Sequence, residues 1–135
     1  MSNVESDLTQ ALNAQAEVMV AALGYPALWA GKGGDKPSDE HVTIQTLAGD
    51  NVPAGLSDQV YTRQGFLIVT LVSPLGVFDI VSREKAGDIA AYFLRGQRLT
   101  ANATTVTIAS HSIKAGRVIG QRWETAIWIS YRSMT

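Results

Sequence analysis

The chain has 135 residues, of which 46% are hydrophobic and 17% are charged, and its formal net charge at pH 7 is −1. This length is typical of one domain with its own core, so we expect a single domain over residues 1–135. The absence of cysteine excludes disulfides, thiolate metal sites and cysteine nucleophiles. No apolar run is long enough to cross a bilayer, and the polar, acidic start lacks the features of a secretory signal. We therefore expect a soluble protein that stays in the cytoplasm where it is made.

The two halves of the chain carry opposite charge. Residues 1–60 hold eight acids and two bases, whereas residues 61–135 hold four acids and nine bases. In a compact monomer the two halves could simply neutralise each other. The alternative is self-association, because an acidic patch on one subunit would attract a basic patch on the next and direct a head-to-tail contact. The charge pattern leaves both interpretations open.

The first part of the chain reads as one helix, one strand and two loops. Residues 25–40 contain two prolines and three glycines, which predicts a long loop. Residues 42–46 alternate as a half-buried strand, and residues 48–58, with two glycines and a proline, predict a second loop. Long loops are commonly held by a partner, which favours an assembly protein. The helix precedes them and can end at Gly24, since apolar residues recur at three- and four-residue steps: Val4, Leu8, Leu12, Ala16, Met19 and Leu23.

The second part predicts three strands and a helix. Residues 63–74 are apolar on both faces, as in a central strand. Residues 77–94 have apolar residues at helical spacing, including Ile80 and Phe93, and Gly96 is expected to cap this helix. The runs TTVTIASHSI and RWETAIWISYR alternate and should pair as antiparallel strands. The order predicts an α+β fold, with a mostly antiparallel β-sheet of about four strands and two helices packed on one face.

No pattern in the sequence predicts catalysis. The two histidines, His41 and His111, have no serine or carboxylate at a catalytic spacing and no further metal ligands. The GKGGDK run at residues 31–36 lacks the spacing and the terminal Lys-Ser/Thr pair of a phosphate-binding loop. Asp39 and Glu40 are adjacent, so on an extended chain they point apart. We predict no catalytic residue, no cofactor and no metal site, and hence a protein that is not an enzyme.

Arginines accumulate near Trp and Tyr in the second half, as at Arg132, and this pattern is one feature of nucleic-acid-binding proteins. The sequence pI of about 6.1 is low for a nucleic-acid-binding domain. Alternating Trp123 and Tyr131 fit a core face at least as well as a stacking platform. Direct binding is therefore not the expected function.

Several runs together resemble the tail terminator family of long-tailed, siphovirus-like phages. They are RQGFLIVTLVSPLG, a helix ending in AAYFLRGQRLT, the strand TVTIAS and the closing strand ETAIWISYR. Phe93, Gly96 and Leu99 stand where this family has a phenylalanine, a glycine and a leucine. The resemblance spans residues 24–132 and is most specific over residues 64–100.

This resemblance implies a structural virion protein located at the head-proximal end of the tail and assembled in the host cytoplasm. Its copies would form a hexameric ring that caps the tail tube, stops tube polymerisation and joins the tail to the head–tail connector or neck protein. Phage DNA would pass through the hole without sequence-specific binding. Two alternatives stay open: another neck, tail-completion or tail-tube protein of related fold, and a small ligand-binding domain or enzyme with residues 25–40 as a lid.

The charge pattern also gives candidate residues for the contact between subunits. We expect arginines of the second half to lie at the subunit boundary and to pair with acids of the first half. In the alternative, the arginines line the hole and contact DNA phosphates. The arginines are Arg95, Arg98, Arg117 and Arg122, and the acids are Asp35, Asp39, Glu40 and Asp58.

Overall fold

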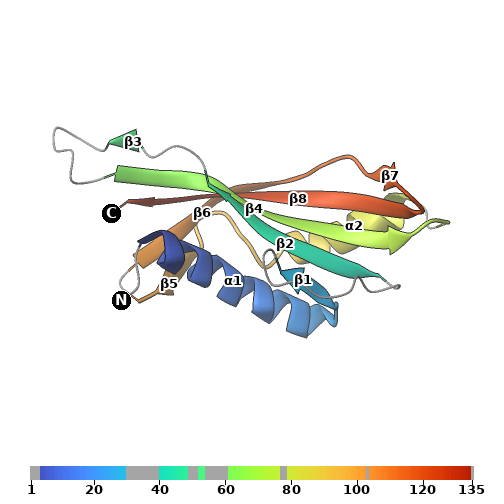
Figure 1. The fold of residues 1–135 in the computed structure, drawn as a ribbon, viewed down its shortest axis with the longest axis horizontal. Coiled ribbons are helices and arrows are strands. Elements are labelled where there is room, and N and C mark those ends of the chain that lie inside the picture. The colour runs from blue at the N-terminus through green and yellow to red at the C-terminus, as the bar shows by residue number, and fades with distance from the viewer. Residues whose placement is uncertain are drawn as a thin grey trace.

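The computed structural model describes residues 4–29, 40–48, 52–53, 61–76, 79–102 and 104–134. Within these described residues, two helices and eight strands follow one another (Figure 1). Their bounds are α1 Val4–Leu23, β1 Ala27–Trp29, β2 His41–Ala48, β3 Val52–Pro53, β4 Tyr61–Pro74, α2 Asp79–Ala90, β5 Arg98–Ala101, β6 Thr104–Ile113, β7 Arg117–Ile119 and β8 Arg122–Met134. The predicted α+β class is confirmed.

The sheet is larger than predicted and is mixed. Its strands run in the order β1-β2-β4-β8-β6-β5, with β3 paired to β4 and β7 paired to β8. β1 is parallel to β2, whereas the other pairs are antiparallel. The expectation of about four, mostly antiparallel strands therefore gave too few strands and did not include the parallel pair of β1 and β2.

The long elements match their predictions. α1 spans the predicted apolar stripe, and Leu8, Leu12 and Met19 are buried. Gly24 ends this helix with a φ of 78°, and its N–H donates to the carbonyl of Val20 at 2.8 Å. β4 lies between β2 and β8, as expected of a central strand, and β6 pairs antiparallel with β8.

Four short strands were not predicted. β1, β3, β5 and β7 are two to four residues long and fall in segments that read as loops or polar stretches. Strands of this length show at most two alternations of apolar and polar residues, so the sequence carries no usable period. They form because each lies beside a longer strand whose backbone N–H and C=O groups need partners.

The second helix is shorter than expected, and the role given to Gly96 was wrong. α2 ends at Ala90 rather than near residue 94. Gly96 has a φ of 86°, and its N–H donates to the carbonyl of Ile108 at 2.7 Å. This glycine therefore makes the turn that brings the chain beside β6, a position where positive φ favours glycine.

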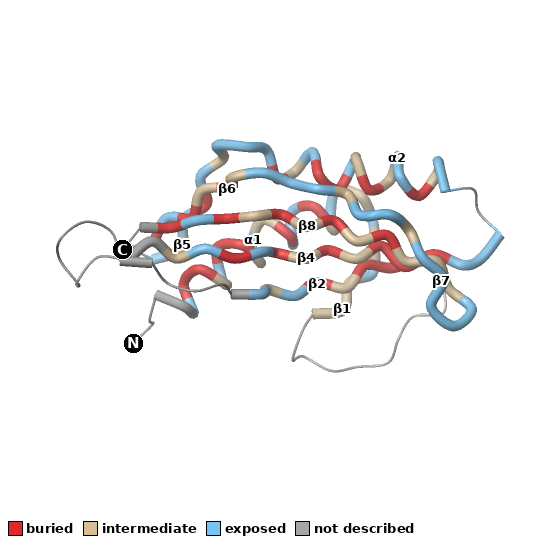
Figure 2. The backbone as a smooth tube through the Cα atoms, turned by 90° about the horizontal axis from the view of Figure 1, so that it is seen from above, coloured by how far each residue is buried: buried red, intermediate tan, exposed pale blue. Residues whose placement is uncertain are grey.

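Both helices pack on the same face of the sheet, which confirms that prediction (Figure 1). We call this the inner face. α1 lies against β5 and β6, while α2 lies against β8, β6 and β4. One continuous core forms between the layers, and Figure 2 shows buried residues along the central strands and on both helices. Its fully buried members include Leu12, Leu67, Ile89, Phe93 and Ile129, each of which contributes about 1.5–3 kcal/mol by leaving water.

Polar contacts fix the helices to the sheet at both ends. Near the start of α1, the Asp7 carboxylate accepts hydrogen bonds from Asn102 Nδ2 at 2.6 Å and from Thr104 Oγ1 at 3.3 Å. On α2, Lys85 Nζ donates to both carboxylate oxygens of Glu40, at 2.9 and 3.0 Å. Ser73 Oγ of β4 donates to the same carboxylate at 3.0 Å. The helical layer is thus held in one position on the inner face.

Candidate functional site

The face of the sheet that turns away from both helices is the candidate site, and we call it the outer face. The pairing of β2, β4, β8 and β6 places residues of alternate parity there. Phe66 and Leu47 on this face are 37% and 46% exposed, whereas Leu67, the next residue in β4, is 0% exposed on the inner face. The central residues of the outer face are Thr43, Gln45, Leu47, Phe66, Ile68, Thr70, Ala126, Trp128 and Ser130.

Two aromatic rings occupy the middle of the outer face. The rings of Phe66 and Trp128 meet edge to face, with centroids 5.1 Å apart and planes at 64°. Lys114 Nζ lies 5.4 Å from the centroid of the Trp128 ring, within range of a cation–π contact. Protein interfaces are enriched in aromatic residues, which bury a large area at low cost in side-chain entropy.

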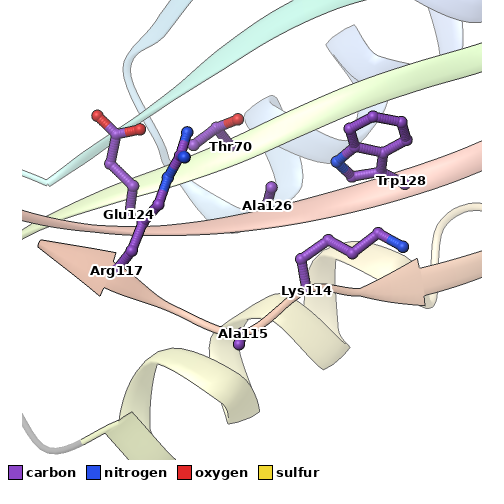
Figure 3. A pocket seen from close by; sticks show the side chains of 7 residues that line it. All are labelled: Thr70, Lys114, Ala115, Arg117, Glu124, Ala126 and Trp128. Atoms are coloured by element: carbon purple, nitrogen blue, oxygen red, sulfur yellow. The ribbon is translucent and has the colours of Figure 1, made fainter. Parts of the chain in front are cut away.

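One end of the outer face is a small hollow beside β7. Figure 3 shows Lys114, Arg117, Glu124 and Trp128 around it, and its volume is about 240 Å³. Arg117 and Glu124 are cross-strand partners in register. This volume lies below the range of about 300–1,000 Å³ that is typical of small-molecule sites. The hollow therefore fits a side chain of a partner better than a metabolite.

Three arginines gather at the other end of the outer face. Arg98 of β5 pairs with Thr107 of β6, which in turn pairs with Arg132 of β8, so these three residues form one row across the sheet. Arg95 lines a hollow of about 160 Å³ together with Thr107 and Arg132. Both Arg98 and Arg132 are exposed. The outer face thus has a basic group at each end and aromatic rings between them.

The structure brings the predicted arginines onto this one face. Arg95 and Arg98 belong to one basic end and Arg117 to the other. Arg122 pairs with Pro74 and Ile119 and continues the outer-face parity of β8 beyond Glu124. The prediction did not include Lys114 or Arg132 among these candidates. The parity of β8 carried the signal for Arg132, since Trp128 and Ser130 alternate there with the buried Ile127 and Ile129.

Among the four predicted acids, Glu40 is the one that lies within the described residues. Glu40 lies on the inner side and is already partnered by Lys85 and Ser73 of the same chain. Asp35, Asp39 and Asp58 lie outside the described residues, as does the GKGGDK run at residues 31–36. Their pairing with arginines of a neighbouring copy stays a prediction.

The titratable groups of the described chain do not form a catalytic arrangement. His41 is buried in β2, whereas His111 is exposed on β6. Burial, followed by the charges of Glu40 and Asp88, raises the pKa of the Tyr25 hydroxyl above 10.0. Across the described residues, no group of three or more His, Cys, Asp or Glu side chains could hold a metal ion. Within the same residues, no helix has the length and apolar character to span a membrane.

Comparison with known proteins agrees with the resemblance seen in the sequence. A chain from the virion of a native gene transfer agent particle has the same fold, with a TM-score of 0.69 and 10% identity over 100% of both chains. A second solved chain, which has no descriptive name, gives a TM-score of 0.76 and 13% identity over 93% of this chain and 92% of that chain. No curated protein matches the chain. The family model described as phage tail terminator protein matches residues 7–131, nearly the whole chain, and this protein therefore belongs to the phage tail terminator family.

Proposed function

We propose that this protein forms a hexameric ring that caps the head-proximal end of the phage tail tube. The ring stops tube polymerisation and joins the tail to the head connector, while its hole lets DNA pass. Membership in a family of structural tail proteins supports this function. The observation that carries it in the structure is the outer face, where apolar and basic side chains stay exposed although the chain has a closed core of its own.

An exposed face with apolar side chains is unusual for a protein that works as a monomer. Apolar patches on soluble proteins commonly mark contacts with other proteins. Besides Leu47 and Phe66, a second apolar group lies at the β7 end of the sheet, where Leu75, Val118 and Ile119 are 42–58% exposed. Pro74 and Ile119 both pair with Arg122, which places this group at one end of the molecule (Figure 1). Two separate surfaces suit a protein that contacts its own copies and further virion proteins.

A ring requires two different surfaces on each subunit. In a head-to-tail contact, one patch binds a different patch of the next copy, and the rotation between copies closes the ring. The opposite net charges of the two halves of the chain favour a contact of this kind. Catalysis has no part in this function.

The alternative is another neck, tail-completion or tail-tube protein, because proteins of one fold differ in function through their surfaces. Electron microscopy of the purified protein, alone and with tail tubes that lack a cap, separates these functions. A terminator gives closed rings that sit on one end of each tube and prevent further growth. A tube protein gives stacked rings that lengthen with concentration. Single subunits that never bind tube ends would refute the proposal, and native mass spectrometry would count the subunits in any ring.

A further inference from the structure

We propose that the outer face receives helix α2 of a neighbouring copy, so that each ring contact joins the sheet layer of one subunit to the helical layer of the next. The inference rests on the proposed ring and names its two surfaces. It replaces the first-half acids expected from the sequence with acids of α2.

Charge in this molecule separates by layer. Among the described residues, six bases lie on or at the ends of the outer face, namely Arg95, Arg98, Lys114, Arg117, Arg122 and Arg132, and only one acid, Glu124, lies with them. The two helices show the opposite balance. α1 contains three acids and no base, and α2 contains three acids and two bases. Surfaces of opposite sign on two layers of one subunit can attract each other only between copies.

The outward side of α2 carries the acids in a regular stripe. Ile80, Glu84 and Asp88 follow one another at four-residue steps, so they lie on one side of the helix. All three are exposed, whereas Ser82, Ala86 and Ile89 on the opposite side are buried. The remaining acid, Asp79, is held by Arg83 of the same helix at 2.8 Å. Within the described residues, Glu84 and Asp88 make no ion pair, and their carboxylates remain available to a partner.

The exposed apolar residues fit the same contact. Ile80 on α2 is 65% exposed. The middle of the outer face offers Phe66 and Trp128, whose rings can cover such a side chain. Interfaces typically combine an aromatic centre with arginines around it. A contact between α2 and the outer face would therefore bury Ile80 against Phe66 and Trp128 and bring the opposite charges together.

The lengths of the two surfaces are compatible. A helix of 12 residues is about 18 Å long, since each residue adds about 1.5 Å. The outer-face residues of β8 from Glu124 to Arg132 extend over about 26 Å at about 3.3 Å per residue. α2 can therefore lie over the aromatic middle while basic side chains approach it from both ends.

Double-stranded DNA is the other partner that a basic face could bind, and two observations disfavour it. Leu47 and Phe66 have no counterpart in a phosphate backbone. Six bases per subunit facing the hole would also bind phosphates strongly and release counterions, which retards a genome that must pass. A contact between subunits would instead bury the apolar residues and pair the basic residues with acids.

The test is a charge swap between the two layers. The sheet variant is R98E with R132E, and the helix variant is E84K with D88K. All four residues are exposed, so both variants should fold, and thermal melts would verify this. Each variant alone sets like charges against each other at every contact. We expect the concentration needed for ring formation to rise about tenfold or more.

An equimolar mixture of the two variants should restore rings. The acidic α2 of the sheet variant then meets the basic face of the helix variant, and the reversed surfaces of the second contact also have opposite charge. Such rings contain alternating subunits, which native mass spectrometry resolves by mass. The matched control is E17K, which reverses an exposed acid on α1 and should leave ring formation unchanged.

Several outcomes would overturn the inference. Normal rings from both separate variants would do so, as would folded variants that fail to form rings when mixed. Normal rings from the sheet variant with weaker retention of duplex DNA would assign the outer face to the hole. If the unmodified protein forms no rings on its own or on tubes, the proposed function fails, and the contact inferred here fails with it.

Discussion

The two faces of the sheet are built from the same strands but have different roles. In β4 and β8, the inner residues Leu67, Val69, Ile127 and Ile129 are completely buried by the helices. The outer residues of the same strands include an exposed phenylalanine, hydroxyl groups and basic side chains. Because successive residues of a strand point to opposite faces, one sequence segment can serve folding and assembly at the same time. Substitutions of inner-face residues should therefore change stability, whereas substitutions of outer-face residues should change assembly.

The largest difference is expected for leucine-to-alanine changes on the two faces. Leu67→Ala removes a completely buried side chain and should lower the free energy of unfolding by about 2–5 kcal/mol. Leu47→Ala removes the same atoms from a residue that is 46% exposed and should cost about 0.5 kcal/mol. Urea denaturation of dilute protein measures both values. Equal losses would mean that the outer face belongs to the core.

Two glycines sharpen the contrast between crowded and open positions. A Cβ at Gly65 would collide with the carbonyl oxygen of Leu47 and lie 2.7 Å from Tyr131 Oη. Gly65→Ala should therefore destabilise the protein by about 1–3 kcal/mol. At Gly87 in α2 a Cβ meets nothing within 4 Å, so Gly87→Ala should stabilise by about 0.5–1 kcal/mol. Thermal melts that shifted in the same direction for both variants would contradict this prediction.

Two acids of α1 provide a comparison within the helical layer. Asp7 is 6% exposed and accepts hydrogen bonds from Asn102 and Thr104. Asp7→Ala leaves these groups without their acceptor and should cost about 1–3 kcal/mol. Glu17→Ala removes an exposed carboxylate from the same helix and should change stability by no more than about 0.5 kcal/mol. If denaturation gives similar values, the contact of Asp7 with the turn after β5 does not stabilise the fold.

The smallest expected effect concerns Tyr25, beside the junction of α1 and the sheet. Its pKa is raised above 10.0, first by burial and then by the charges of Glu40 and Asp88. The folded state therefore holds this proton more tightly than the unfolded state. The resulting stabilisation is complete below pH 10.0 and is lost as the pH rises through the higher folded pKa.

Ultraviolet titration of the protein and of Tyr25→Phe isolates the ionisation of this hydroxyl. Glu40→Gln should lower the pKa of Tyr25 only in part, because burial is the larger cause. A return to the ordinary value in Glu40→Gln would instead assign the shift to the carboxylate.

Sequence reasoning succeeded where a segment has many repeats of one period. α1 has 20 residues, and β4, β6 and β8 have 14, 10 and 13 residues, so their periods were clear. It failed for β1 and β7, whose three residues contain too little pattern. Gly96 was assigned to the wrong role because a positive φ is equally useful at a helix end and in a turn.

The candidate site was predicted as a set of residues but not as a place. Arg95, Arg98, Arg117 and Arg122 were chosen for their charge, and they come from three separate segments of the chain. Only strand pairing shows that Arg98 and Arg132 share a row through Thr107. The acids of α2 were not selected, because their exposure depends on which side of the helix packs on the sheet.

The sequence alone determined the long elements, the alternation within them and the resemblance to tail terminators, because these properties depend on residues that are near one another in the chain. The tertiary structure decided the rest. The position of the two helices selected which of two apolar sheet faces became the core and left Phe66 exposed and Trp128 half-buried. The order of strands then placed distant bases together, since long-range pairing, and not local preference, sets which side chains become neighbours.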